Sequence, residues 1–186
     1  MKTIFLSGSR TISRLNDDIR ARIQNIIRNG FQIIVGDANG ADKAMQKYLH
    51  GTGYRNVTVY CAGNNCRNNI GEWNIRKINV DPKLKGREFY TAKDKKMAAS
   101  ADYGLVLWDG KSAGSINNIL ELLKHQKFAV VYFSPEKKIY TLKSFNDADN
   151  LVKKCGDAIR NDLKKKSHWD NVATCQSEPS QSAFAF

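Results

Sequence analysis

The chain has 186 residues, of which 41% are hydrophobic, so one domain with a sizeable core is expected. No apolar run approaches the roughly 18 residues that cross a bilayer, and Met1–Gly8 is too short for a signal peptide. We therefore expect a cytoplasmic protein with no membrane partner. The four cysteines do not cluster like a disulfide framework.

The formal net charge is +12. Two interpretations are open: affinity for a polyanion such as nucleic acid, or a lysine-rich surface that is simply solvated. Much of the charge lies in Leu151–Ser167, where six basic residues accompany two acidic ones. Aromatic residues that would stack on a single strand do not interleave with this charge.

Short apolar segments rich in β-forming residues alternate with amphipathic segments along the first 135 residues. The expected strands are Lys2–Ser7, Phe31–Val35, Val57–Cys61, Tyr103–Leu107 and Phe128–Phe133. The expected helices run from Asn16 or Asp17 to about Asn29, over Ala41–His50, over Phe89–Ser100, and from about Ile116 to His125. The alternation and the nearly continuous apolar strands predict an α/β fold, a Rossmann-like parallel sheet with helices on both faces.

The remaining segments are less regular. Gly63–Arg87 is rich in Asn, Gly and charge, and only Trp73–Val80 in it is a candidate strand. After Pro135, Lys138–Leu142 is a candidate edge strand and Ser144 a candidate helix cap. We therefore divide the chain into a sheet domain at 1–135, a small C-terminal strand and helix extension at 136–167, and a tail at 168–186 that we expect to be disordered. Covering a sheet edge and forming a homo-oligomer are two possible uses of the extension.

The first candidate site is the turn after the first strand, Ser7-Gly8-Ser9-Arg10. Open α/β sheets bind ligands at the carboxyl ends of their strands. Gly8 allows the backbone to approach a ligand, Ser7 and Ser9 offer hydroxyls, and Arg10 offers a planar fork for phosphate or carboxylate. The alternative is a plain strand-to-helix connection with a surface arginine.

The second candidate site is GDANGAD at 36–42, between the second strand and its helix. It matches neither the Walker loop nor the dinucleotide GxGxxG motif. Gly36, Asp37 and Gly40 nevertheless form a short polar turn that fits a phosphate or a ribose. Asp42 falls in the first helical turn, where it either binds ribose hydroxyls or caps the helix.

The third candidate site is the turn WDGKSAGS at 108–115. Trp108 either stacks on a base or closes the core, and the core is favoured. Asp109 is expected to bind sugar hydroxyls, and Asn117 and Asn118 to offer amides to polar ligand edges. Phosphate is expected at the backbone N–H groups near the start of the next helix, a helix end that suits anions. The residues expected to hold it are Gly110, Ser112, Gly114 and Ser115.

Motifs for metal binding or triad catalysis are missing. The spacing of Cys61 and Cys66 is not that of a zinc knuckle, the three histidines are scattered, and no GxSxG nucleophile elbow occurs. We expect neither a metal nor a cofactor.

Three blocks in this order, SGSR, GDANGAD and KDKKMAASADYGLVLWDGKSAGS, resemble the SLOG superfamily over about Met1–Phe133. The superfamily includes DNA-processing protein A, the lonely-guy phosphoribohydrolases and YspA/YAcAr-like proteins, and the first two blocks are most similar to the YspA-like branch. The resemblance implies a nucleotide-type ligand above the carboxyl ends of the strands. It implies less about activity, because one fold hosts many functions.

The lonely-guy enzymes cleave the N-glycosidic bond of a nucleoside monophosphate, with motifs similar to ERKxxM and PGGxGTxxE. Alignment on Met97 places Lys93 and Asp94 where the family has Arg-Lys, which makes both residues candidates for the ligand site. Alignment on the glycine and serine at 114–115 places Asn117 and Asn118 where acidic residues of the family fall. An amide does not replace a carboxylate as a general base, so binding is favoured over cleavage.

Three functions remain open. The favoured one is a module that binds, and so senses or sequesters, a nucleotide or a nucleotide-derived signalling ligand. The second is a nucleotide N-glycosidase or transferase, with Asp94 or Asp109 as its catalytic carboxylate. The third is a DNA-binding protein, which rests on the positive charge alone.

Overall fold

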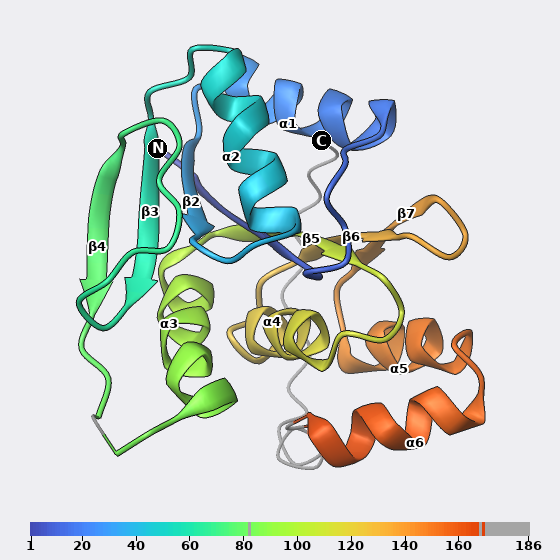
Figure 1. The fold of residues 1–186 in the computed structure, drawn as a ribbon. Helices are drawn as coiled ribbons and strands as arrows, with labels where there is room; N and C mark the ends of the chain where they lie inside the picture. Colours follow the sequence, from blue (N-terminus) through green and yellow to red (C-terminus); the bar gives the residue numbers. More distant parts are fainter. Residues whose placement is uncertain (82, 168, 170–186) are drawn as a thin grey trace.

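A seven-stranded sheet in the order β4-β3-β2-β1-β5-β6-β7 runs through the centre of the computed structural model, which describes residues 1–81, 83–167 and 169 (Figure 1). Every neighbouring pair is parallel except β6 and β7. The strands are β1 (Thr3–Gly8), β2 (Gln32–Gly36), β3 (Val57–Ala62), β4 (Asn74–Ile78), β5 (Tyr103–Trp108), β6 (Ala129–Phe133) and β7 (Lys138–Leu142). The predicted α/β class with a Rossmann-like sheet is confirmed.

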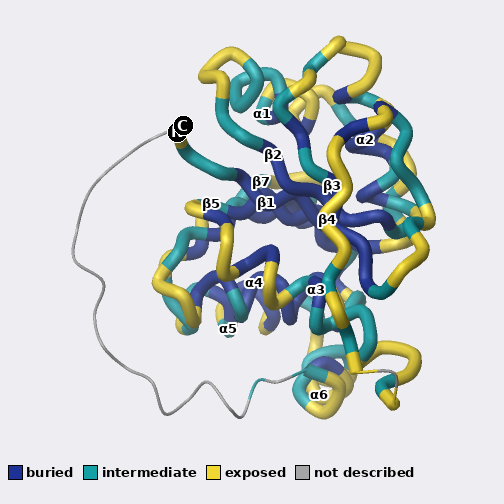
Figure 2. Tube along the Cα trace, turned by 90° about the vertical axis from the view of Figure 1, so that its left-hand side faces the viewer, coloured by how far each residue is buried: buried dark blue, intermediate teal, exposed yellow. Residues whose placement is uncertain are grey.

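Helices cover both faces of this sheet (Figure 1). They are α1 (Asp17–Arg28), α2 (Ala41–Gly51), α3 (Gly86–Ser100), α4 (Ala113–Lys124), α5 (Phe145–Lys153) and α6 (Asp157–Lys166). The first two pack on one face, and α3, α4 and α5 pack on the other, with α6 outside them (Figure 1). Buried residues line the strands and the inner sides of the helices, so one apolar layer lies on each side of the sheet (Figure 2).

Alternation along the central strands explains these two layers. Ile4 and Leu6 of β1 face the layer under α1 and α2, whereas Phe5 between them faces the layer under α3 and α4. Successive side chains of a strand point to opposite faces, so a strand that is apolar at every position is buried on both. The nearly continuous apolar runs of the sequence are the signature of this arrangement.

Two helices begin earlier than the sequence predicts. The structure starts α4 at Ala113 instead of Ile116, because the Ser112 side chain caps the helix and accepts a hydrogen bond from the Ser115 N–H at 3.3 Å. Gly114 lies inside the first turn of α4, and its poor helix propensity made the sequence predict a later start for the helix. Similarly, α3 starts at Gly86 instead of Phe89.

The edge at β4 has two features that the sequence did not reveal. The parallel connection from β3 to β4 spans residues 63–73 without a helix. A disulfide joins Cys61, at the end of β3, to Cys66 in this connection, with a Cα–Cα distance of 5.2 Å. The cysteine spacing indicated no disulfide framework, and the structure places this single bridge beside the candidate site.

The C-terminal extension builds onto the same core. The predicted edge strand is β7, which pairs antiparallel with β6, and α5 begins with a Ser144–Asp147 capping box. Leu151 of α5 and Leu163 of α6 are buried in the same apolar layer as Ile116 of α4. The tail predicted to be disordered lies outside the described residues, except for Trp169.

The sheet has a switch point between β1 and β5. From β1 the chain builds outward through β2, β3 and β4, and then returns through α3 to place β5 on the other side of β1. At the carboxyl ends of β1 and β5 the next segments therefore diverge, which opens the crevice where α/β sheets bind ligands. Among the described helices, none combines the length and the apolar character that crossing a membrane requires.

The packing of α6 gives a first prediction. Leu163 is fully buried, so Leu163→Ala should lower the free energy of unfolding by about 2–5 kcal/mol through lost burial and the cavity left behind. Urea unfolding followed by circular dichroism measures this loss, and the exposed Lys165→Ala on the same helix serves as the control. A separate, early loss of helical signal in the wild type would show instead that α6 unfolds independently of the core.

Candidate functional site

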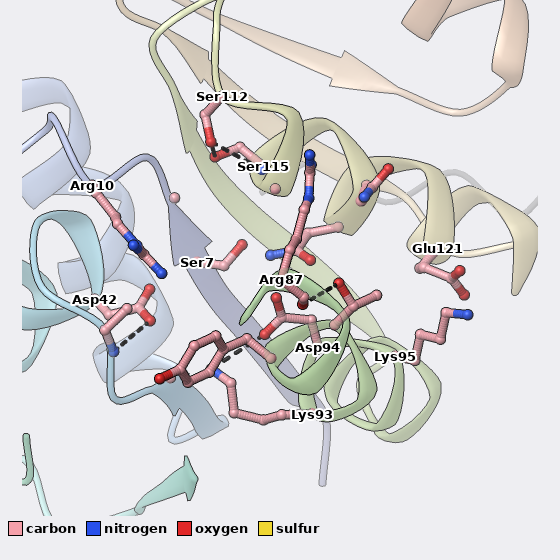
Figure 3. Close-up of a pocket in the computed structure, with 18 of the residues that line it drawn as sticks. Ser7, Arg10, Asp42, Arg87, Lys93, Asp94, Lys95, Ser112, Ser115 and Glu121 are labelled. Atoms are coloured by element: carbon pink, nitrogen blue, oxygen red, sulfur yellow. Dashed lines mark hydrogen bonds and ion pairs between the residues drawn. The ribbon is translucent and has the colours of Figure 1, made fainter. Parts of the chain in front are cut away.

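A cavity of about 640 Å³ opens at the switch point (Figure 3). Its floor is formed by the ends of β1 and β2, and its walls by the first turns of α2, by α3, and by the β5–α4 turn with the N-terminal half of α4. This volume lies in the range of small-molecule and cofactor sites. Eleven of the predicted ligand-site residues line it: Gly8, Arg10, Gly36, Asp42, Lys93, Asp94, Asp109, Ser112, Gly114, Ser115 and Asn118.

One wall is the N-terminus of α4. The first backbone N–H groups of a helix have no partner within the helix, and the helix dipole adds partial positive charge there. The Ser112 hydroxyl satisfies the Ser115 N–H, and the Ser115 hydroxyl lies 3.0 Å from the Ser9 hydroxyl. Gly114 adds no side chain at this wall, so the turn leaves room for an anion at the helix end.

Ser7 is an unsatisfied group in the floor. It is only 4% exposed, it lines the cavity, and its Oγ has no hydrogen-bond partner within the described residues. Figure 3 shows this side chain between Arg10 and Arg87, pointing into the cavity. A buried hydroxyl that faces a cavity is available to bond to whatever molecule fills the cavity, a water or a ligand.

Asp109 holds the turn after β5 together. Its Oδ1 accepts hydrogen bonds from the N–H groups of Lys111 and Ser112, at 3.0 and 2.7 Å, and its Oδ2 accepts one from the Thr11 hydroxyl at 2.7 Å. Burial raises the pKa of this carboxyl, but these hydrogen bonds outweigh burial and lower it. The carboxylate thus stays ionised and fixes the cavity wall, a positioning role that suits a general base poorly.

A buried charge cluster lies under the other side of the cavity. The Lys93 ammonium is 3.6 Å from the Asp37 carboxylate and 3.2 Å from that of Asp94, and only 4% of the lysine side chain is exposed. Burial lowers the pKa of Lys93, but the charges of Asp94, Asp42 and Asp37 outweigh burial and raise it. The lysine is therefore a permanent buried cation.

Asp37, which pairs with Lys93, is also held by hydrogen bonds from Arg67. The guanidinium donates to both carboxylate oxygens, at 3.0 and 2.7 Å, and the Arg67 N–H donates a third bond at 3.1 Å. Burial raises the pKa of Asp37, but Arg67 and Lys93 outweigh burial and lower it. Asp37, which itself does not face the cavity, thus forms ion pairs with both Arg67 and Lys93, and Asp94 supplies the second negative charge beside Lys93.

Asp42 differs from Asp37 and Asp109 in that its pKa is raised instead of lowered. It faces the cavity, is 4% exposed, and accepts one hydrogen bond from the Ala38 N–H at 3.2 Å. Burial raises its pKa to about 6, with Asp94 and Asp37 adding to the rise and Lys93 opposing it. A Cβ at Gly36 would clash with the Asp42 carboxylate and the Lys93 ammonium, so a larger residue there would force both charged groups to shift.

Four cations at the cavity have no acidic partner within the described residues. They are Arg10, Arg87, Lys95 and Lys111, and all four are exposed. Lys93 and Arg67, the other two cations of the lining, are already paired with carboxylates. The unpaired positive charge is therefore concentrated at the mouth, where it attracts an anion.

Five predicted ligand residues lie behind the cavity wall instead of on it: Ser9, Asp37, Gly40, Trp108 and Gly110. For Trp108, base stacking is wrong and the core interpretation is confirmed, because the ring is fully buried against Phe133 and its Nε1–H donates to the Ser112 carbonyl at 3.1 Å. Gly110 also packs toward Phe133.

The other three of these residues shape the turns. The Ser9 hydroxyl forms a hydrogen bond with the Ser115 hydroxyl and accepts one from the Asp109 N–H. Asp37 forms ion pairs with Arg67 and Lys93. Gly40 packs against the Arg10 backbone. They fix the positions of the residues that do face the cavity.

Several lining residues on α3, on α4 and in the connecting segments were not predicted from the sequence. They are Arg67, Arg87, Tyr90, Thr91, Lys95, Lys111 and Glu121. The Arg67 guanidinium stacks on the Tyr90 ring at 4.2 Å, which joins the β3–β4 connection to α3. The lining residues on α3 recur at 87, 91 and 94–95, which is a helical spacing. The predicted helix began only at Phe89, so Arg87 fell outside it and this spacing could not be recognised from the sequence.

One group of possible metal ligands occurs within the described residues. Oxygen and sulfur atoms of Asp37, Cys61 and Cys66 lie within 4.8 Å of one another. The two sulfurs are bonded to each other, and the carboxylate is held by Arg67. The group therefore offers no thiolate ligand while the disulfide is intact.

Comparison of the chain with protein-family models, with curated proteins and with solved structures finds no match. The three-block resemblance to the SLOG superfamily therefore stays a prediction. The geometry and the charge of the cavity are the evidence that bears on function.

The raised pKa of Asp42 predicts a pH dependence of stability. The folded state holds the Asp42 proton more tightly than the unfolded chain, so the stabilisation is complete below pH 4 and is lost as the pH rises from about 4 to 6. Asp42→Asn should remove this pH dependence. The difference in the free energy of unfolding between variant and wild type should therefore change by on the order of 3 kcal/mol between pH 4 and pH 6.

Urea unfolding between pH 4 and pH 7.5 measures this effect. Asp109→Asn is the matched control, because the pKa of Asp109 is lowered and its titration lies below the tested range. An Asp42→Asn variant that is destabilised at pH 7.5 would show that the attraction between Asp42 and Lys93 outweighs the burial of the carboxylate.

Proposed function

We propose that this cavity binds a nucleotide or a nucleotide-derived signalling ligand, and that the protein senses or sequesters it. The observation that carries the proposal is that the α4 N-terminus, the unsatisfied Ser7 hydroxyl and three unpaired cations all line one 640 Å³ cavity. Those cations are Arg10, Arg87 and Lys111. A phosphate group satisfies all three features at once.

The rest of the cavity suits a nucleoside. Tyr90, stacked on Arg67, adds an aromatic ring to the wall, and Asp42 and Asp94 offer carboxylate oxygens of the kind that accept hydrogen bonds from ribose hydroxyls. The position at the β1–β5 switch point is also where doubly wound sheets hold such ligands. The resemblance to the SLOG superfamily points to the same class of ligand.

Isothermal titration calorimetry tests the proposal directly. The ligands are a panel of mononucleotides, cyclic nucleotides and NAD derivatives. Saturable binding of at least one of them is the expected result, and its affinity should fall as salt is added, because exposed cations contribute. A chain that binds none of the panel would refute the proposal.

Ser7→Ala should separate stability from binding. Removing an unsatisfied buried hydroxyl should leave the free energy of unfolding unchanged or raise it, whereas nucleotide binding should weaken about tenfold or more through the loss of a hydrogen bond to phosphate. Thermal unfolding and calorimetry measure the two effects.

Ser9→Ala is the matched control for this variant. Its hydroxyl is equally buried but bonds Ser115 and Asp109, so its removal should destabilise the fold by about 1 kcal/mol. A Ser7→Ala protein that binds as tightly as the wild type would place the phosphate elsewhere.

A second candidate function is cleavage of the N-glycosidic bond of the bound nucleotide. Asp42 favours it, because a carboxyl in the cavity with a pKa of about 6 is a competent proton donor near neutral pH. In this reaction the glycosidic bond breaks, the base leaves with a proton, and a water oxygen bonds to the sugar carbon. Of the two carboxylates proposed from the sequence, Asp94 faces the cavity beside Lys93, and Asp109 is committed to the turn.

Base release from nucleotides, followed by chromatography, tests this second function. Turnover should fall about a hundredfold or more in Asp42→Asn, the loss expected for a general acid. Turnover that survives in Asp42→Asn and in Asp94→Asn would reject these roles, and no turnover on any nucleotide would leave the protein a binder.

A further inference from the structure

The cavity continues from the α4 N-terminus, where the phosphate is proposed to bind, into the space between α3 and α4. On α3 the lining residues recur one helical turn apart, at Arg87, Thr91 and Lys95. On α4 they recur at Gly114, Asn118 and Glu121. Both helices begin at the carboxyl edge of the sheet and run back along it, since α3 follows β4 and α4 follows β5. At 1.5 Å per residue, Gly114 and Glu121 are about 10 Å apart along the helix.

Asn118 is the polar centre of this groove. It is 7% exposed, it lines the cavity, and its side-chain amide has no hydrogen-bond partner within the described residues. The amide carries two N–H donors and one carbonyl acceptor. It faces the cavity one helical turn beyond Gly114 and Ser115, past the expected phosphate position, where its donors and acceptor can bond to a ligand.

Two opposite charges lie at the far end. Figure 3 shows the Glu121 carboxylate and the Lys95 ammonium on the same side of the cavity, away from Arg10 and Asp42. They do not form an ion pair with each other or with another described residue, so both remain available to a ligand. Their charges cancel, in contrast to the three unpaired cations around the α4 N-terminus. A second phosphate is therefore not favoured there, and a neutral group with several donors and acceptors is.

We propose that the groove between α3 and α4 is a second subsite, which binds the sugar of a nucleoside diphosphate sugar. This inference rests on the proposed nucleotide site and specifies its ligand class. The diphosphate lies at the α4 N-terminus with Ser7, and the sugar hydroxyls bond to Asn118, Glu121 and Lys95. Carboxylate, amide and ammonium groups together match hydroxyls that both donate and accept.

Calorimetry on two matched series tests the subsite: ADP against ADP-ribose and ADP-glucose, and UDP against UDP-glucose. At least one conjugate should bind about tenfold or more tightly than its own diphosphate, since two or three net hydrogen bonds are worth about that much. The advantage should disappear in Asn118→Ala and in the double variant Lys95→Ala, Glu121→Gln, while the affinity for the diphosphate stays unchanged.

Lys96→Ala is the matched control, because Lys96 is exposed on α3 and does not line the cavity. The double variant changes residues that are not buried, so it keeps the test valid if Asn118→Ala fails to fold. A diphosphate that binds as tightly as every conjugate, or an advantage that survives in the variants, overturns the sugar subsite and leaves the nucleotide site intact. Failure of every ligand to bind overturns the nucleotide site itself.

Discussion

The buried Lys93 ammonium is the interaction on which most of the site depends. It joins Asp37, in the turn after β2, to Asp94 on its own helix, and Asp37 in turn holds Arg67 of the β3–β4 connection. Removal of one partner from such a buried pair leaves an uncompensated charge, at a cost of about 3–5 kcal/mol. One lysine thus fixes the turn after β2, α3 and the β3–β4 connection relative to one another. Gly36 leaves the space that the Lys93 ammonium occupies, because a side chain at this position would displace the ammonium.

The wall formed by the β5–α4 turn and the start of α4 is fixed by a smaller hydrogen-bond network. Asp109 and Ser9 tie the turn after β5 to the turn after β1, and the Ser9 hydroxyl reaches Ser115 at the start of α4. Both networks satisfy their own members, whereas the Ser7 hydroxyl at the floor of the cavity has no hydrogen-bond partner within the described residues. Natural proteins break rules of this kind mainly at functional sites. This contrast distinguishes the residues that build the cavity from those that the proposed ligand would contact.

The fold was predictable from the sequence because its strands are apolar at consecutive positions and its helices show a clear apolar stripe. Of the site, the loop residues that come directly after strands were predictable, since strand ends share one edge of the sheet. Arg87, Lys95 and Glu121 were not, because they lie on helices, where a polar residue facing a cavity has the same pattern as one facing solvent. The ligand role of Asp37 and the base-stacking alternative for Trp108 were wrong for the converse reason. Both residues lie at the ends of buried strands, but each packs against or pairs with a residue distant in sequence, Arg67 and Phe133 respectively.

The distribution of charge favours a small anion over a nucleic acid. On α5 and α6, the bases Lys153, Arg160 and Lys164 share the Asp149 carboxylate, and Lys166 pairs with Asp162. Exposed pairs of this kind add little stability, but each reduces the field that a polyanion would meet. Arg10, Arg87, Lys95 and Lys111, which have no acidic partner among the described residues, instead line a cavity whose volume excludes a duplex. The basic composition of the chain is thus compatible with a ligand that binds inside the fold, beside the α4 N-terminus.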